Sequence, residues 1–148
     1  MRVVIDTNIA FSAILNTNSK IAKIILQPKS KLNLYSTVQL EYELAEHWDK
    51  LKKISKYSEI ELHKAVALIT SKIKFINVEL IPQILLKKAQ KLTSDTDIDD
   101  TEFVVALTEH IRGNLWTGDK NLQKGLKIKK WDRLILTDGL YKLIVKRN

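Results

Sequence analysis

Short apolar runs alternate with amphipathic stretches along the chain. Residues 3–5 form a continuous β-branched run that ends at the polar residues 6–8, which is typical of a buried parallel strand followed by a turn. The same pattern predicts further short strands at residues 32–35, 75–78, 115–117 and 134–136.

Helical signals lie between these strands. Ser58 opens a capping box, and the apolar positions of residues 62–73 follow it at helical spacing. Ser36 is predicted to cap another helix in the same way, and the apolar stripe of that helix continues to Leu51. Further helices are predicted from about residue 9, at 83–91 after Pro82, at 99–112, at 121–124, and from a Thr137–Asp138 cap to residue 146.

The order of these elements predicts the fold class. Strands that alternate with helices indicate an α/β protein, in which a parallel sheet is covered by helices on both faces. The sequence has no internal repeat, low-complexity tract or linker. We therefore expect residues 1–148 to form a single domain.

The composition excludes several kinds of chemistry. The chain has no Cys, which excludes thiolate nucleophiles, disulfides, iron–sulfur clusters and Cys-bound zinc. The N-terminus turns polar at Asp6 before a signal-peptide apolar region could form, and no apolar run approaches the ~18–20 residues that span a bilayer. We therefore expect a soluble, cytoplasmic protein without a membrane partner.

Charge is distributed unevenly along the chain. The net charge is +8, and residues 120–148 hold nine Lys or Arg against two acids. Residues 92–119 instead hold seven acids against one Arg. An acidic segment inside a basic chain is what a cation site beside a phosphate-binding rim would look like, although acids also gather at helix N-termini.

Two carboxylates follow predicted strands. Asp6 comes directly after the first strand, and Asp119 comes just after the strand at residues 115–117. Because ligands of open parallel sheets bind beyond the carboxyl ends of the strands, both side chains could project into one crevice. Asp6 or Asn8 could equally serve as the N-cap of the next helix, and the sequence leaves the role of Asp6 open.

Further acids lie on predicted helices. Asp100 is in line with the inward-facing side of its helix, where an unpaired carboxylate is costly and requires a cation or strong donors. Asp97 lies three residues earlier and could bring a second oxygen to the same centre, whereas Asp99 and Glu102 should point to solvent. Glu43 borders an apolar stripe, and on helix geometry alone such a residue is more often a surface residue than a ligand.

Four segments carry a family resemblance: Ile5-Asp6-Thr7-Asn8, Glu43-Leu44-Ala45-Glu46, Asp97-Ile98-Asp99-Asp100 and Trp116-Thr117-Gly118-Asp119-Lys120. In their order and spacing they resemble the PIN-domain nucleases, and most closely the VapC-like toxins of toxin–antitoxin systems. The match covers nearly the whole chain. It implies a three-layer α/β/α sandwich around a central parallel sheet of about five strands.

The resemblance also implies a cluster of acids that binds a divalent metal. The implied catalytic residues are Asp6, Glu43, Asp100 and Asp119. The implied metal ligands are Asp6, Asp97, Asp100 and Asp119. Asn8 and Thr117 are implied to support this cluster. Oxygen ligands without a Cys or His cluster select Mg²⁺ or Mn²⁺. The histidines, which lie on separate predicted helices, are expected to have ordinary packing roles; they are His47, His63 and His110.

The chain departs from the family pattern at two places. Gly113-Asn114 stands where the family often has an acid shortly before a strand, so this position offers no charge. Glu41 and Glu46 lie close enough in sequence to compete with Glu43 for the glutamate position.

By this resemblance the protein would be a metal-dependent endoribonuclease and the toxin of a type II toxin–antitoxin system. Its partners would be RNA, a cognate antitoxin protein and a second copy of the chain. Basic side chains between residues 120 and 133 would hold the RNA backbone, with Lys120, Lys124 and Lys130 preferred. The alternatives are an RNA-processing nuclease outside such systems and an inactive PIN scaffold that binds RNA. A phosphotransferase of the haloacid-dehalogenase kind is disfavoured, because that family needs an Asp where Asn8 stands.

Overall fold

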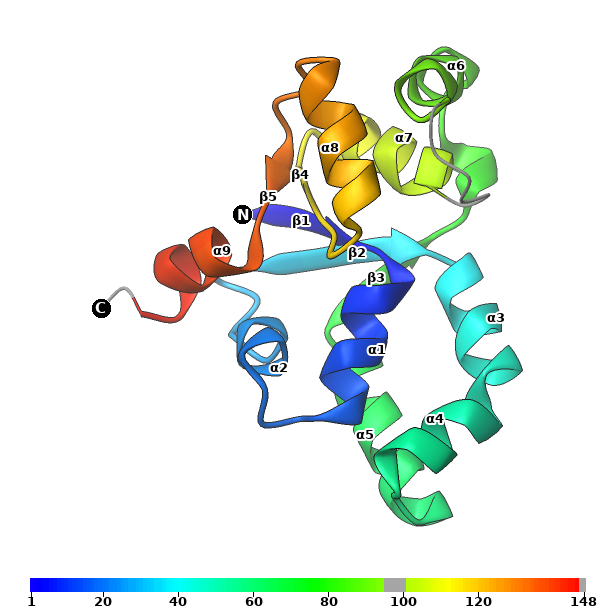
Figure 1. The fold of residues 1–148 in the computed structure, drawn as a ribbon, viewed down its shortest axis with the longest axis vertical. Helices are drawn as coiled ribbons and strands as arrows, with labels where there is room; N and C mark the ends of the chain where they lie inside the picture. The colour runs from blue at the N-terminus through cyan, green and yellow to red at the C-terminus, as the bar shows by residue number, and fades with distance from the viewer. Residues whose placement is uncertain (95–100, 147–148) are drawn as a thin grey trace.

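The structure, a computed structural model, describes residues 1–94 and 101–146. Its strands are β1 (Arg2–Ile5), β2 (Asn33–Thr37), β3 (Ile73–Ile76), β4 (Asn114–Trp116) and β5 (Leu134–Ile135). They form one sheet in the order β3-β2-β1-β4-β5, and every neighbouring pair is parallel (Figure 1). Val4 lies at the middle of the sheet, where it is paired with Tyr35 on one side and Leu115 on the other.

Helices cover both faces of this sheet (Figure 1). One layer contains α1 (Thr7–Leu15), α2 (Lys20–Ile25), α3 (Gln39–Glu46), α4 (Trp48–Ser55), α5 (Glu59–Thr70) and α9 (Thr137–Ile144). The other layer contains α6 (Gln83–Leu92), α7 (Thr101–Ile111) and α8 (Lys120–Ile128). The protein is thus the three-layer α/β/α sandwich that the sequence predicted.

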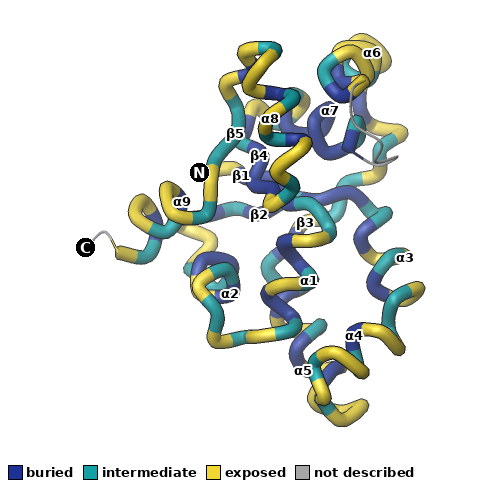
Figure 2. The backbone as a smooth tube through the Cα atoms, viewed as in Figure 1, coloured by how far each residue is buried: buried dark blue, intermediate teal, exposed yellow. Residues whose placement is uncertain are grey.

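Alternate residues of β1 enter two different cores. Val3 and Ile5 pack in the core formed with α1, α2 and α5, whereas Val4 packs in the core formed with α7 and α8. All three side chains are fully buried, and Figure 2 shows the central strand buried between the two helical layers. Because both faces of the sheet are covered, this strand has a continuous apolar run and no alternation of polar residues.

Two helix starts follow the predicted local chemistry. The Ser58 hydroxyl oxygen accepts from the backbone N–H of Glu61 at 3.1 Å, and the Glu61 carboxylate accepts from the backbone N–H of Ser58 at 2.9 Å. This reciprocal pair is the predicted capping box at the start of α5. Pro82 precedes the first residue of α6 as predicted, and its missing N–H costs nothing there.

The prediction that Ser36 caps a helix is wrong. Ser36 belongs to β2, because it is paired with Phe75 of β3, and its hydroxyl donates to the buried carbonyl oxygen of Ile5 at 2.8 Å. The following helix begins at Gln39 without a side-chain cap. It also ends at Glu46, and a separate helix begins at Trp48, where one helix to Leu51 was predicted.

Ile73 belongs to β3 and not to the preceding helix. It is paired with Leu34 of β2, so β3 covers residues 73–76 and the predicted strand at 75–78 is shifted by two residues. A short 3₁₀ turn, Val78–Leu80, takes the place of the rest of the predicted strand. The side chain of Ile73 is buried in the same core as α5, which explains why it fitted the apolar stripe of that helix.

Smaller differences concern the other helices. The short α2 was not predicted; Ser19 caps it by accepting from the backbone N–H of Ala22 at 3.1 Å. α8 is longer than predicted and ends at Ile128. The predicted Thr137–Asp138 cap of α9 is wrong, because the helix begins at Thr137 and its N-cap is Leu136, which has no polar side chain; the Thr137 hydroxyl oxygen accepts from the indole N–H of Trp116 at 2.9 Å. Among the described residues, no helix is both long and apolar enough to cross a bilayer.

Candidate active site

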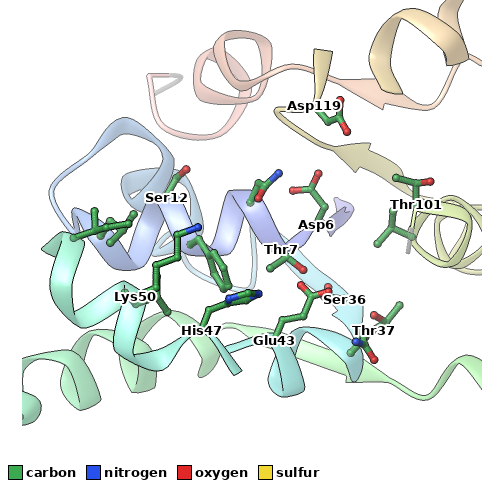
Figure 3. Close-up of a pocket in the computed structure, with 17 residues that line it drawn as sticks. Asp6, Thr7, Ser12, Ser36, Thr37, Glu43, His47, Lys50, Thr101 and Asp119 are labelled. Atoms are coloured by element: carbon green, nitrogen blue, oxygen red, sulfur yellow. The ribbon is translucent and has the colours of Figure 1, made fainter. Parts of the chain in front are cut away.

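A cavity of about 560 Å³ opens where β1, β2 and β4 end, between α1, α3, α4 and the first residues of α7. Such a position beyond the carboxyl ends of parallel strands is where open α/β sheets bind their ligands. Polar residues from several elements meet there (Figure 3). The lining includes Asp6, Thr7, Asn8, Phe11, Ser12, Ser36, Thr37, Glu43, His47, Lys50, Ile54, Thr101, Val104 and Asp119.

Asp6 has both of the roles that the sequence left open. It is the N-cap of α1, because its Oδ1 accepts from the backbone N–H of Ile9 at 3.1 Å, and it also lines the cavity. Its Oδ2 accepts from the hydroxyl of Thr117. Burial raises the pKa of the Asp6 carboxyl, and the negative charge of Asp119 adds to this effect, against the hydrogen bonds from Thr117 and Ile9.

Asp119 is held at the start of α8 by the same kind of contact. Its Oδ1 accepts from the backbone N–H groups of Asn121 at 3.0 Å and Leu122 at 3.2 Å, so it caps this helix. Its Oδ2 is buried and has no hydrogen-bond partner among the described residues. One oxygen of Asp119 is therefore fixed by the fold, and the other is available to a ligand.

Thr117 connects these two carboxylates. Its side chain is buried; its hydroxyl donates to Asp6 and accepts from the backbone N–H of Asp119 at 3.1 Å. The side-chain amide of Gln123 donates to the carbonyl oxygen of Thr117 at 2.6 Å. Asn8, the other predicted supporting residue, is exposed and lines the cavity.

Glu43 is the glutamate that the structure places at the cavity. It is half-buried on α3, and Figure 3 shows Asp6 between Glu43 and Asp119. Glu41 and Glu46 are exposed and are not part of the lining. The choice between the three glutamates depended on which face α3 turns to the cavity, and this face contains Glu43.

Asp97 and Asp100 lie outside the described residues, as does Asp99. Thr101 directly follows Asp100 in the sequence and lines the cavity, with 7% of its surface exposed. Within residues 1–94 and 101–146, no group of three or more His, Asp or Glu side chains is arranged to hold a metal ion. The described part of the site therefore brings together two strand-end carboxylates, with Glu43 across the cavity.

The basic residues between 120 and 133 that were predicted to hold the RNA backbone do not line the cavity. Lys120, Lys124 and Lys130 are exposed and do not line the cavity. Lys129 connects the end of α8 to the end of α6, because its ammonium donates to the carbonyl oxygens of Lys91 at 2.9 Å and Leu92 at 3.1 Å. The guanidinium of Arg133 also interacts with other residues of the fold.

Arg133 belongs to a cluster around Glu109. The guanidinium of Arg133 lies 3.7 Å from the Glu109 carboxylate and donates to the carbonyl oxygen of Gly113 at 3.2 Å. Glu109 also accepts from the indole N–H of Trp131 at 2.7 Å and from Lys88 at 3.0 Å. Burial opposes ionisation of Glu109, but these donors together lower its pKa. The cluster holds α6 and α7 to the segment before β5 and does not contribute to the cavity.

Two basic residues that do line the cavity were missed as site residues. His47 was expected to have an ordinary packing role; it does pack edge-on against Phe11, with ring centroids 5.9 Å apart, and it also faces the cavity. Lys50 lines the cavity as well. The available signal was spacing, because Glu43, His47 and Lys50 follow one another at intervals of four and three residues.

The donor set suits a hard divalent cation. Asp6 and Asp119 offer carboxylate oxygens, one of them buried without a hydrogen-bond partner among the described residues, and the chain has no Cys. A cation near Asp6 would offset the burial and the repulsion that raise its pKa. Oxygen ligands of this kind favour Mg²⁺ or Mn²⁺ over softer metals.

Comparison with known proteins gives a family and a fold. A family model described as PIN domain matches residues 4–137. No curated protein sequence matches the chain. Among solved structures, a chain in the crystal structure of VapBC2 from Rickettsia felis bound to a DNA fragment from their promoter is similar, with a TM-score of 0.63. The alignment covers 92% of this chain and 97% of that chain at 15% identity, a level that shows a shared fold.

Proposed function

The chain belongs to the PIN domain family, and on this premise we propose that it is a metal-dependent endoribonuclease and the toxin of a type II toxin–antitoxin system. The observation that carries the proposal is the second carboxylate oxygen of Asp119. It is buried without a hydrogen-bond partner among the described residues, and the negative charge of Asp119 contributes to the raised pKa of Asp6. A buried, unpaired carboxylate oxygen is costly unless a cation or donor binds it, which supports a metal at this position.

We assign Asp6, Asp97, Asp100 and Asp119 as the residues that hold Mg²⁺ or Mn²⁺. Support for Asp100 comes from its neighbour Thr101, which lines the cavity; Asp97 is assigned from the family resemblance. The chemistry that such an ion supplies is a lowered pKa for water and stabilisation of the charge that develops on a phosphodiester.

The protein's own side chains would position the reacting groups. Thr117 and the start of α1 fix the orientation of Asp6, and the start of α8 fixes Asp119. Glu43, across the cavity from Asp119, would accept a proton from the attacking water or orient it. Water would attack the phosphorus directly and displace one of the two ester oxygens, which would leave as a ribose hydroxyl after taking up a proton. No side-chain nucleophile is required.

RNA would be held largely through its phosphates. The net charge of +8 favours a polyanion, and Lys120, Lys124 and Lys130 are exposed on or just after α8, the helix that Asp119 caps. We propose these three as backbone contacts outside the cavity. Such contacts supply affinity and register but do not read the base sequence.

A partner protein is also proposed. The similar chain from Rickettsia felis belongs to VapBC2, which was solved on promoter DNA. From this likeness and from the motifs shared with VapC-like toxins, we propose that a cognate antitoxin binds this chain, that the chain forms a homodimer, and that it acts in the cytoplasm.

Cleavage of a mixed pool of single-stranded and structured RNA tests the enzymatic proposal. Protein free of any copurifying partner is incubated with Mg²⁺, Mn²⁺ or EDTA, beside Asp119→Asn, which removes the charge but keeps a good helix cap. Asp132→Asn is the matched control, because Asp132 is exposed and outside the cavity. We expect cleavage that requires metal, is lost in Asp119→Asn and persists in Asp132→Asn.

Three results would contradict the proposal in different ways. A folded wild type that binds RNA but cuts none with either metal would indicate an RNA-binding scaffold. Cleavage that persists in EDTA would remove the metal mechanism. Expression in bacterial cells tests the toxin role separately: wild type should arrest growth and Asp119→Asn should not, whereas equal growth with an active enzyme would indicate an RNA-processing nuclease.

A further inference from the structure

The cavity has an acidic end and a basic end. Asp6 and Asp119 lie at the acidic end, and Figure 3 shows His47 and Lys50 to the left of them, with His47 beside Glu43. The lysines predicted to bind RNA lie outside the lining. Lys50 and His47 are therefore the basic side chains that line the cavity among the residues the structure describes.

Lys50 carries a charge that the fold does not neutralise. Its ammonium has no ion pair or hydrogen bond to any residue in the described ranges. Glu46 lies four residues earlier, where a continuous helix would offer an ion pair. However, α3 ends at Glu46 and α4 begins at Trp48, and the break at His47 leaves the two side chains unpaired.

An apolar wall lies beside these basic groups. It is formed by Phe11, Leu15, Leu51 and Ile54. Ile54 is 55% exposed, so part of this wall faces solvent. The ring of Phe11 packs edge-on against His47 at an interplanar angle of 79°. His47 therefore helps to orient the Phe11 ring.

We infer that the basic end of the cavity binds one nucleotide of the RNA, next to the scissile phosphodiester. Lys50 and His47 bind the phosphate of this nucleotide, and its base lies against Phe11 and Ile54. This inference rests on the proposed function, because it places the nucleotide relative to a bond cut at Asp6 and Asp119. Lys50 and His47 are positioning residues that bind substrate and take no part in proton transfer.

The chemistry of this end favours a nucleotide as its occupant. A nucleotide combines a negative charge with a flat aromatic ring, and the cavity offers a cation beside an apolar surface. The basic groups and the apolar wall lie in one continuous cavity with the acids, so a single RNA strand can reach both ends. A segment of a partner protein at the same place is the competing occupant.

Replacement of Lys50 tests the inference. Lys50→Met keeps the length of the side chain without its charge, and Lys50→Arg keeps the charge. Lys53→Met is the matched control, because Lys53 is exposed on the same helix but does not line the cavity. Affinity for a short fluorescein-labelled single-stranded RNA is measured by anisotropy in EDTA over a series of salt concentrations.

We expect Lys50→Met to weaken binding about 3- to 10-fold and to reduce the slope of log affinity against log salt by about 0.7. In cleavage assays KM should rise by a similar factor with kcat little changed, and Lys50→Arg should restore both. An affinity and slope equal to those of Lys53→Met would overturn the inference. So would unchanged RNA binding with lost antitoxin binding, which would assign this end to a protein. Because the binding assay needs no metal, its result stays readable if no cleavage is found.

Discussion

The hydroxyl of Thr117 donates to Oδ2 of Asp6 and accepts from the backbone N–H of Asp119. One side chain at the end of β4 thus sets the positions of two carboxylates that are 113 residues apart in sequence, at numbers 6 and 119. Their separation depends on a hydrogen-bonded link as well as on the pairing of the strands.

Thr117→Val should weaken cleavage and change its pH dependence. The substitution keeps the shape of the side chain but removes a hydrogen bond that lowers the pKa of Asp6, so this pKa should rise further. If ionised Asp6 is needed, the acidic limb of the pH–rate profile should move to higher pH, with activity reduced about 10- to 100-fold. Thr117→Ser should restore both. A reduced rate with an unmoved profile would argue against this link.

Asp6→Asn should stabilise the metal-free protein while abolishing cleavage. The folded-state pKa of Asp6 is raised above 3.8, so the folded protein holds this proton more tightly than the unfolded chain. The ionised carboxylate therefore lowers stability at neutral pH, and the cost disappears as the pH falls through the raised pKa. Thermal melts in EDTA should show the largest gain of the variant near neutral pH and little gain in acid. An equal gain at every pH would contradict this explanation.

Glu43→Gln should reduce cleavage about 10²- to 10⁴-fold, because it removes a base at the cavity while keeping the size of the side chain. Glu46→Gln, on the exposed side of the same helix, should leave the rate unchanged. Rates measured at saturating RNA compare the two variants directly. Loss of activity in Glu46→Gln alone would mean that α3 turns a different face to the substrate.

Glu109→Gln should destabilise the protein without changing its chemistry. Trp131 and Lys88 donate to this carboxylate and lower its pKa below 4.5 despite its burial. The stabilisation is present above the unfolded-state pKa and is lost as the pH falls through the folded-state pKa. We expect a loss of about 1–3 kcal/mol in the free energy of unfolding at neutral pH, shrinking in acid. Cleavage per folded molecule should be unchanged.

Gly113→Ala should destabilise the fold at the start of β4. An added Cβ would lie 2.6 Å from the carbonyl oxygen of Arg2, and that backbone cannot move away without disturbing β1. We expect a loss of about 1–3 kcal/mol. Gly139→Ala is the control, because nothing lies within 4 Å of its added Cβ in α9, and it should gain about 0.5–1 kcal/mol. Urea unfolding measures both.

The elements that the sequence predicted correctly are those with local signals. The run at residues 3–5 and the pair Ser58 and Glu61 each carry their own structural cause within a few residues. Ser36 shows where local signals end, because a serine hydroxyl suits a helix cap and a buried strand equally well. Its role is decided by pairing with Phe75, which lies 39 positions further along the chain.

The sequence likewise predicted some residues of the site and not others. Parallel topology alone brings Asp6 and Asp119 to one edge of the sheet, and the structure places them there. The spacing from Glu43 indicated only that His47 and Lys50 share its side of the helix. Their placement at the cavity also depends on the break between α3 and α4 and on Phe11 opposite. Gly113 was noted for a missing charge, whereas its importance is steric.

The strand order also determines when the cavity can form during synthesis. β1 leaves the ribosome before the other strands of the sheet, yet one of its two neighbours in the sheet is β4, which begins at residue 114. A nascent chain that ends before this strand cannot place Asp119 beside Asp6, however well its first helices have folded. The acidic end of the cavity is thus completed only after residue 119 has been translated, so a product truncated before this residue has no route to activity through this pair of carboxylates.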